Sequence, residues 1–119
     1  MNPEKFKSRS KELAREIIAL VDKLPRTIAS ATLAKQLVRS GTSIGANYRA
    51  ACRARSNAEM LSKLGIVEEE ADETMFWLEL LMESGFVEEE AGMPLWNEAD
   101  EILSMTVASI RTLRTRPRK

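Results

Sequence analysis

Hydrophobic residues recur at the spacing of an α-helix in four segments of the chain, and proline or glycine helps to separate these segments. Pro25 ends the first segment, and Ser56 with Glu59 has the S-x-x-E spacing of a capping box at the start of the third. Gly85 suits the C-terminal cap of the third helix, and Pro94 follows a predicted loop over residues 88–92. The pattern predicts helices over residues 4–24, 28–54, 56–84 and 94–115.

The short segments between these helices favour an all-α fold in which the chain runs up, down, up and down. We therefore predict one antiparallel four-helix bundle domain over residues 1–119. The length suits a single domain that buries enough surface to fold without disulfides. The basic tail, residues 116–119, is expected to fray.

The end of the third predicted helix is apolar on more than one side. A helix that is hydrophobic nearly all round is buried on several sides, so one bundle core does not account for this segment. We expect it to mediate association between subunits. The alternative is a wide apolar stripe that the loop before the fourth helix partly covers. The residues concerned are Met75, Phe76, Trp77, Leu78, Leu80, Leu81 and Met82.

The chain contains no histidine and a single cysteine, Cys52. The missing histidine removes the commonest general base and the commonest metal ligand, and one cysteine excludes an internal disulfide. No glycine-rich phosphate loop or paired-cysteine metal motif occurs. We interpret the acidic runs at residues 68–70 and 88–90 as solvated faces rather than a cation site. The sequence therefore indicates a protein that is not an enzyme and needs no cofactor or metal.

No segment has the roughly 20 consecutive apolar residues of a membrane span. The first ten residues are charged, and no apolar run follows them. We therefore expect no signal peptide, no membrane partner and a cytoplasmic location, which also suits a single free thiol.

Charge is balanced in total but segregated along the chain, which carries 18 basic and 18 acidic residues. Residues 1–55 hold twelve basic and four acidic residues, a net of +8. Residues 56–101 hold one basic and fourteen acidic residues, a net of −13, and residues 102–119 hold five basic residues and no acidic one. An antiparallel bundle would then be electrically bipolar.

In that arrangement the basic residues gather at one pole, and acidic residues, among them Glu79, Glu83, Glu98 and Glu101, gather at the other. A broad positive surface binds phosphate backbones through counterion release. Structured RNA fits best and DNA is possible on the same grounds, because few aromatic residues lie at this pole to stack on unpaired bases. The candidate contacts are Lys5, Lys7, Arg9, Lys11, Arg15, Arg49, Arg53, Arg55, Arg111 and Arg114. The alternatives are a solvated basic end without a ligand and a surface that docks an acidic protein.

Two segments carry a resemblance to a known family. Residues 36–56 read QLVRSGTSIGANYRAACRARS, and residues 70–81 read EADETMFWLELL. They resemble the signature QLxRSxxSIxxNYxEAxxARS, then EAxETxYWLxLL, of the four-helix bundle protein family first described as proteins encoded in intervening sequences of 23S rRNA genes. The signature positions that we single out are Ser43, Ile44, Asn47, Tyr48, Trp77, Leu78 and Leu81.

The resemblance implies a bacterial protein that assembles into a homopentameric ring, in a family without an established enzymatic activity. A related branch, the accessory variability protein of diversity-generating retroelements, binds nucleic acid and a reverse transcriptase. Where the signature has a glutamate after NYx, this chain has Ala50, so any role of that carboxylate is lost here. We expect Asn47 and Tyr48 to form a satisfied polar spot inside or between bundles, the alternative being a ligand contact.

The first functional hypothesis is therefore a non-catalytic oligomer that binds nucleic acid, structured RNA above all, through its basic pole. The alternative is a scaffold that binds an unidentified protein and has no role with nucleic acid.

Overall fold

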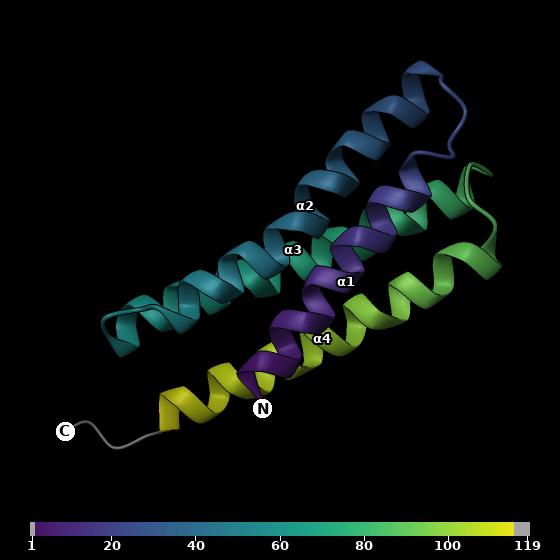
Figure 1. The fold of residues 1–119 in the computed structure, drawn as a ribbon. Helices are drawn as coiled ribbons and strands as arrows, with labels where there is room; N and C mark the ends of the chain where they lie inside the picture. The colour runs from purple at the N-terminus through teal and green to yellow at the C-terminus, as the bar shows by residue number, and fades with distance from the viewer. Residues whose placement is uncertain (1, 116–119) are drawn as a thin grey trace.

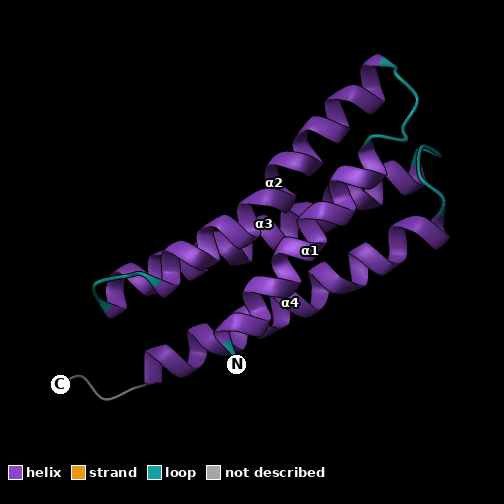
Figure 2. Ribbon diagram, viewed as in Figure 1, coloured by secondary structure: helices purple, strands orange, loops and turns teal. Residues whose placement is uncertain are grey.

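The structure is a computed structural model that describes residues 2–115, and these residues form four α-helices and no β-strand (Figures 1 and 2). The all-α prediction is therefore confirmed for this part of the chain. The predicted frayed tail, residues 116–119, lies outside the described residues. The helices are α1 (Pro3–Val21), α2 (Ile28–Cys52), α3 (Asn57–Glu83) and α4 (Glu89–Thr115).

Polar side chains just before α1, α2 and α3 accept hydrogen bonds from backbone N–H groups that the first turn of each helix leaves unpaired. Asn2 Oδ1 accepts from the N–H of Glu4 at 3.0 Å, and Thr27 Oγ1 accepts from the N–H of Ser30 at 3.1 Å. The Ser30 hydroxyl in turn accepts from the N–H of Thr27 at 3.2 Å, which completes a capping box. These caps fix where the helices begin, because each satisfies a donor that the helix itself leaves unpaired.

The boundaries of α3 follow the prediction, with one difference in its cap. Ser56 Oγ accepts from the N–H of Glu59 at 3.1 Å, as a capping box requires. The Glu59 carboxylate, however, accepts from the N–H of Arg55 at 3.2 Å rather than from that of Ser56. At the other end, Gly85 has φ +79°, a left-handed conformation that glycine adopts without steric cost.

The start of α4 differs from the prediction. The helix begins at Glu89, so the predicted loop over residues 88–92 is wrong, and Pro94 lies inside the helix. The carbonyl of Glu88 accepts from the N–H groups of Ala91 and Gly92 and so opens the first turn. Pro94 is exposed near this end, where a carbonyl that loses its helical donor can bond to water.

The four helices pack as an elongated bundle of 54 × 21 × 20 Å. α1 contacts α2 and α4, while α3 contacts α2 and α4. The α1–α2 and α3–α4 connections lie at one end, and the α2–α3 connection lies at the other with the N-terminus (Figure 1). Side chains from all four helices fill the core, and the largest fully buried ones are Phe6, Leu13, Ile17, Leu37, Ile44, Leu78, Leu81 and Ile102.

Small residues bring α1 and α2 close together at two places. A Cβ atom on Gly41 would lie 2.5 Å from Cδ1 of Ile17, and one on Gly45 would lie 3.1 Å from Oγ of Ser10. The absence of a side chain at Gly41 and Gly45 thus permits a close approach of α1 to α2. On the other side of α2, the Thr74 hydroxyl lies 3.0 Å from that of Ser40, a hydrogen bond that joins α2 to α3 inside the core.

Two glycine-to-alanine variants test this close approach. Gly65 lies in α3 with nothing within 4 Å of its ideal Cβ position, so Gly65→Ala is expected to gain about 1 kcal/mol from helix propensity. Gly41→Ala gains the same propensity but overpacks the buried Ile17. We expect it to be about 1–3 kcal/mol less stable than Gly65→Ala in urea unfolding. Equal stability of the two variants would contradict tight packing at Gly41.

The apolar end of α3 is only partly covered. Met75, Leu78 and Leu81 are buried, as expected of core positions. The Phe76 side chain is 50 % exposed and meets the edge of Trp77, with ring centroids 5.0 Å apart. This outer face is the segment for which subunit association was predicted, and the association stays a prediction.

Candidate nucleic-acid interface

The ten candidate phosphate contacts come from three helices and one connection. Lys5, Lys7, Arg9, Lys11 and Arg15 belong to α1, Arg49 to α2, and Arg111 and Arg114 to α4, while Arg53 and Arg55 lie between α2 and α3. Lys7 and Arg9 are half-buried, and the other eight are exposed. The ten differ in how far neighbouring carboxylates already neutralise them.

Arg9 is held by two carboxylates of α4. Its Nε lies 2.8 Å from Glu98 Oε2, its Nη2 lies 2.6 Å from Glu98 Oε1, and Nη2 also contacts Glu101. The sequence had placed Glu98 and Glu101 at the opposite pole, which is wrong, because they lie beside the first half of α1. Arg9 is therefore a structural link between α1 and α4 and a poor candidate for a phosphate contact.

This link makes a pH-dependent contribution to stability. The hydrogen bond to Glu98 raises the pKa of Arg9, and the hydrogen bond from Arg9 lowers the pKa of Glu98. A carboxyl with a lowered folded-state pKa stabilises the fold above its unfolded pKa of about 4.3, and this stability is lost as the pH falls through the folded value.

We therefore expect Glu98→Gln to lower the free energy of unfolding by about 1 kcal/mol at neutral pH, a modest value because both side chains are partly solvated. The difference from the parent protein should shrink as the pH falls below about 4. Urea titrations at neutral pH and near pH 3 measure this. A difference that does not change with pH would mean that the Glu98 charge is not the cause.

Two other residues of α1 have carboxylate neighbours within the same helix. Lys7 Nζ lies 3.4 Å from Glu4 Oε1, and Arg15 Nη1 lies 3.8 Å from Glu12 Oε2. Such pairs on a helix surface contribute only a few tenths of a kcal/mol. Lys7 and Arg15 thus remain available to an anion, with part of their charge offset.

Sequence reasoning missed a second neutralised arginine. Arg39 of α2 contacts Glu70 of α3 with 3.0 Å between Nη1 and Oε2, and it also contacts Glu73. Glu70 and Glu73 are three residues apart and so share one face of α3. This spacing is the only feature of the sequence that points to a paired acidic site for an arginine. Like Arg9, Arg39 links two helices and is bound to two carboxylates.

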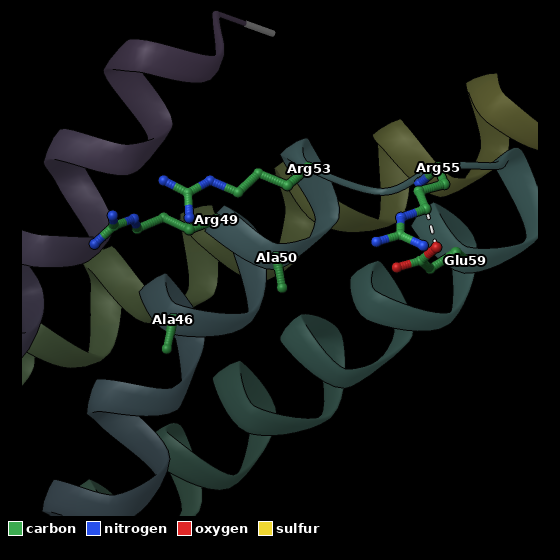
Figure 3. Close-up of a pocket in the computed structure, with 6 residues that line it drawn as sticks. All are labelled: Ala46, Arg49, Ala50, Arg53, Arg55 and Glu59. Carbon is green, nitrogen blue, oxygen red and sulfur yellow. Dashed lines mark hydrogen bonds between the residues drawn. The ribbon is translucent and has the colours of Figure 1, made fainter.

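Arg49, Arg53 and Arg55 form a different arrangement, in which three cations line one hollow of about 540 Å³ (Figure 3). We call it the arginine cleft and define it by these three residues with Ala46, Ala50 and Glu59. Figure 3 shows the Arg53 side chain reaching back toward Arg49, while Arg55 lies nearer Glu59. Among residues 2–115, none of the three guanidinium groups forms an ion pair.

Local sequence explains why these arginines share a surface. Arg49 and Arg53 are four residues apart, so both project from the same side of α2. Arg53 is the C-cap of α2, where a cation is favoured by the helix dipole, but this does not account for Arg55 beyond the helix end. Ala50 lines the cleft at the position where the family signature has a glutamate. The cleft thus lacks the carboxylate that a typical signature would place there.

The signature residues lie in the core or form hydrogen bonds within α2, with Trp77 as the exception. Ile44, Leu78 and Leu81 lie in the core, and Tyr48 is buried against Phe6 with ring centroids 3.9 Å apart. Ser43 Oγ donates to the carbonyl of Arg39 at 2.8 Å, and Asn47 Nδ2 donates to that of Ser43 at 2.9 Å. Trp77 is half-buried, and we have no physical account of its Nε1, which is buried without a hydrogen-bond partner.

Residues 2–115 contain no group of three or more cysteine, aspartate or glutamate side chains placed to hold a metal ion. None of the described helices is long and apolar enough to cross a membrane.

Comparison with known proteins gives one family. The model of the 23S rRNA-intervening sequence protein family matches residues 5–108. A crystal structure of a protein with unknown function from the S23 ribosomal protein family of Bacteroides thetaiotaomicron is similar, with 37 % identity and a TM-score of 0.86. The match covers 93 % of this chain and 99 % of that one. No curated protein matches the chain. The family match spans most of the sequence, and the chain therefore belongs to the 23S rRNA-intervening sequence protein family.

Proposed function

We propose that this protein is a non-catalytic, cytoplasmic oligomer that binds structured RNA, and that the arginine cleft is its principal phosphate-binding surface. The observation that carries the proposal is the contrast among the arginines. Arg9 and Arg39 each contact two carboxylates, whereas Arg49, Arg53 and Arg55 form no ion pair among the described residues. Clustered cations repel one another, and an external polyanion offsets that repulsion.

The shape and chemistry of the cleft favour the phosphate backbone over the bases. Arginine presents a planar fork of donors that matches phosphate oxygens. The two aromatic side chains near this end, Phe6 and Tyr48, stack on each other and are buried, so neither offers a free face to an unpaired base. A duplex recognised by shape and phosphate position fits these features best. The exposed Lys5, Lys11, Arg111 and Arg114 would extend the contact.

We further propose that the antiparallel bundles assemble as a homopentameric ring with parallel axes, which would place every arginine cleft on one face. The alternating positions of the helix connections fit antiparallel helices within each bundle, and the half-exposed Phe76 offers an apolar surface for contact between subunits. A ring would multiply the number of phosphates that one RNA duplex contacts, and so steepen the salt dependence of binding.

A second candidate function is that of a scaffold that binds another protein. The partly exposed apolar side chains on the outer face of α3 support it. Phe76 is half-exposed there beside the half-buried Trp77 and Leu80. Affinity capture from extract with and without nuclease separates the two functions. Partners that remain after nuclease treatment favour the scaffold, and partners lost with the RNA favour the first proposal.

The test of the proposed function is the affinity of the purified protein for a fluorescein-labelled RNA hairpin, measured by anisotropy over a salt series. Three phosphates neutralised at one cleft give a slope of log K against log[salt] of about −2 to −3, and additional contacts make it steeper. A DNA hairpin of the same sequence tests the preference for RNA. The absence of RNA binding at low salt would overturn the proposal and leave the scaffold.

A further inference from the structure

A second concave site lies at the same end of the bundle and is chemically unlike the arginine cleft. It is a groove of about 790 Å³ to which all four helices contribute. We call it the end groove. Volumes of this size, lined mainly by apolar side chains with a few polar groups, are typical of small-molecule sites between the helices of bundles.

The walls of the end groove are suited to a flexible apolar chain. Phe6, Tyr48 and Leu64 are buried and form part of its lining. Met60 and Met105 also line it, and their unbranched, polarisable side chains adapt to the shape of a ligand. Ala108 is exposed on α4 and leaves one side of the groove open.

The polar or charged lining residues besides Cys52 are Asn2, Lys5, Arg9, Tyr48, Ser109 and Thr112. The side chains of Asn2, Arg9 and Thr112 already form hydrogen bonds within the protein. Tyr48 is 4 % exposed, and the Cys52 thiol lies beside its hydroxyl. Burial, and then the neighbouring Cys52 thiol, raise the pKa of this phenol, so it stays protonated and can donate. A thiol is a weak acceptor, which leaves the hydroxyl without a strong partner inside the protein.

The charges at the groove favour an anion with a single negative charge. Arg9 lines the groove, but Glu98 and Glu101 neutralise it. Lys5 also lines it, is exposed, and forms no ion pair among residues 2–115. One unpaired ammonium group and one phenol match a carboxylate better than a doubly charged phosphate.

We propose that the end groove binds a single-chain fatty acid, with the acyl chain against Met60 and Met105 and the carboxylate near Lys5 and the Tyr48 hydroxyl. This site is separate from the proposed RNA-binding function and does not depend on it. The arginine cleft and the end groove share no lining residue, so each can be altered without the other, except through Lys5, which would also extend the RNA contact.

The test is calorimetric titration of the full-length protein with sodium dodecanoate below its critical micelle concentration, with 1-dodecanol as the uncharged comparison. We expect dodecanoate to bind more tightly than the alcohol. Ala108→Trp fills the groove from an exposed position and is expected to weaken binding at least tenfold. Ala91→Trp, at an exposed alanine of α4 outside the groove, is the matched control and should bind as the parent does.

The variants Lys5→Glu and Tyr48→Phe test whether these two side chains bind the carboxylate of dodecanoate. Each removes a charged or hydrogen-bonded contact to the carboxylate and is expected to weaken dodecanoate binding about tenfold while leaving dodecanol unchanged. Lys23→Glu is the control for net charge, because Lys23 is exposed and lies outside the groove. Circular dichroism and urea unfolding confirm that each variant is folded.

Three results would overturn the proposal. One is the absence of dodecanoate binding to the parent protein. Another is binding that Ala108→Trp and Ala91→Trp affect equally, which would place the ligand elsewhere. The third is equal affinity for dodecanoate and dodecanol in the parent, which would exclude recognition of the carboxylate. Amide chemical-shift changes confined to Ala51, Leu64 and Ser109 and their neighbours would support the assigned position.

Discussion

Reversing the three arginines of the arginine cleft is expected to lower the affinity for an RNA hairpin by roughly 100-fold or more at low salt. The variant Arg49→Glu/Arg53→Glu/Arg55→Glu removes three phosphate contacts and puts three carboxylates in their place. The slope of log K against log[salt] should become less negative by about 2 to 3, because each phosphate contact contributes roughly −0.9 to that slope. None of the three side chains takes part in an ion pair among the described residues, so their reversal breaks none. A carboxylate at Arg53, the C-cap of α2, is disfavoured by the helix dipole by only roughly 0.3–1 kcal/mol, so the fold should persist.

The matched control changes the net charge equally but at the other end of the bundle. Lys23, Arg26 and Lys35 are exposed and form no ion pair in the part of the chain that the structure describes. Lys23→Glu/Arg26→Glu/Lys35→Glu is expected to reduce the affinity much less than the cleft variant does. Equal losses in the two variants would mean that RNA responds to net charge and that the cleft has no special role. Size-exclusion chromatography checks that both variants assemble as the parent does.

Truncation of Leu78 is expected to be the most damaging single change to stability. Leu78 is fully buried in α3, and Leu→Ala at such a site removes apolar contacts and leaves a cavity. We expect Leu78→Ala to lower the free energy of unfolding by about 3 kcal/mol, measured by urea titration at a fixed protein concentration.

Ile28→Ala provides the comparison, because Ile28 is 90 % exposed at the start of α2. Its truncation should change stability by less than about 0.5 kcal/mol. If the two variants lost equal stability, Leu78 would not occupy the core position assigned to it, and the orientation of α3 would have to be revised.

The fold was largely predictable from the sequence because its signals are local. Pro25, Ser56 and Gly85 mark three helix ends within one to four residues of those in the structure. The start of α4 was not predictable in this way, because Pro94 resembles a helix start while the true start lies at Glu89. Gly92 lies in that first part of α4, where a Cβ atom would be 2.5 Å from Sδ of Met82. Close packing against α3 thus fixes this segment, and such contacts leave no local signal.

The same distinction holds for the candidate site. Arg49, Arg53 and Arg55 come together because they are close in sequence at one helix end, and the sequence placed all three among the ten candidate contacts. Arg9 and Glu98 are 89 residues apart, and whether they meet depends on how α1 and α4 are positioned along the bundle. Formal charge counts therefore overestimated the free positive charge of α1. Similarly, the end groove arises from four separate segments, and none of them shows a concave site by itself.

Photo-cross-linking tests most directly whether RNA binds at the arginine cleft. Ala46 is exposed and lines the cleft, so the photoreactive residue p-benzoylphenylalanine can replace it without disturbing the core. Ala29, exposed near the start of the same helix, is the control position. We expect a labelled RNA hairpin to cross-link from position 46 and not from position 29. Cross-linking from position 29 alone, or from neither position in a protein that still binds the hairpin, would contradict the assignment of the cleft as the RNA-binding surface.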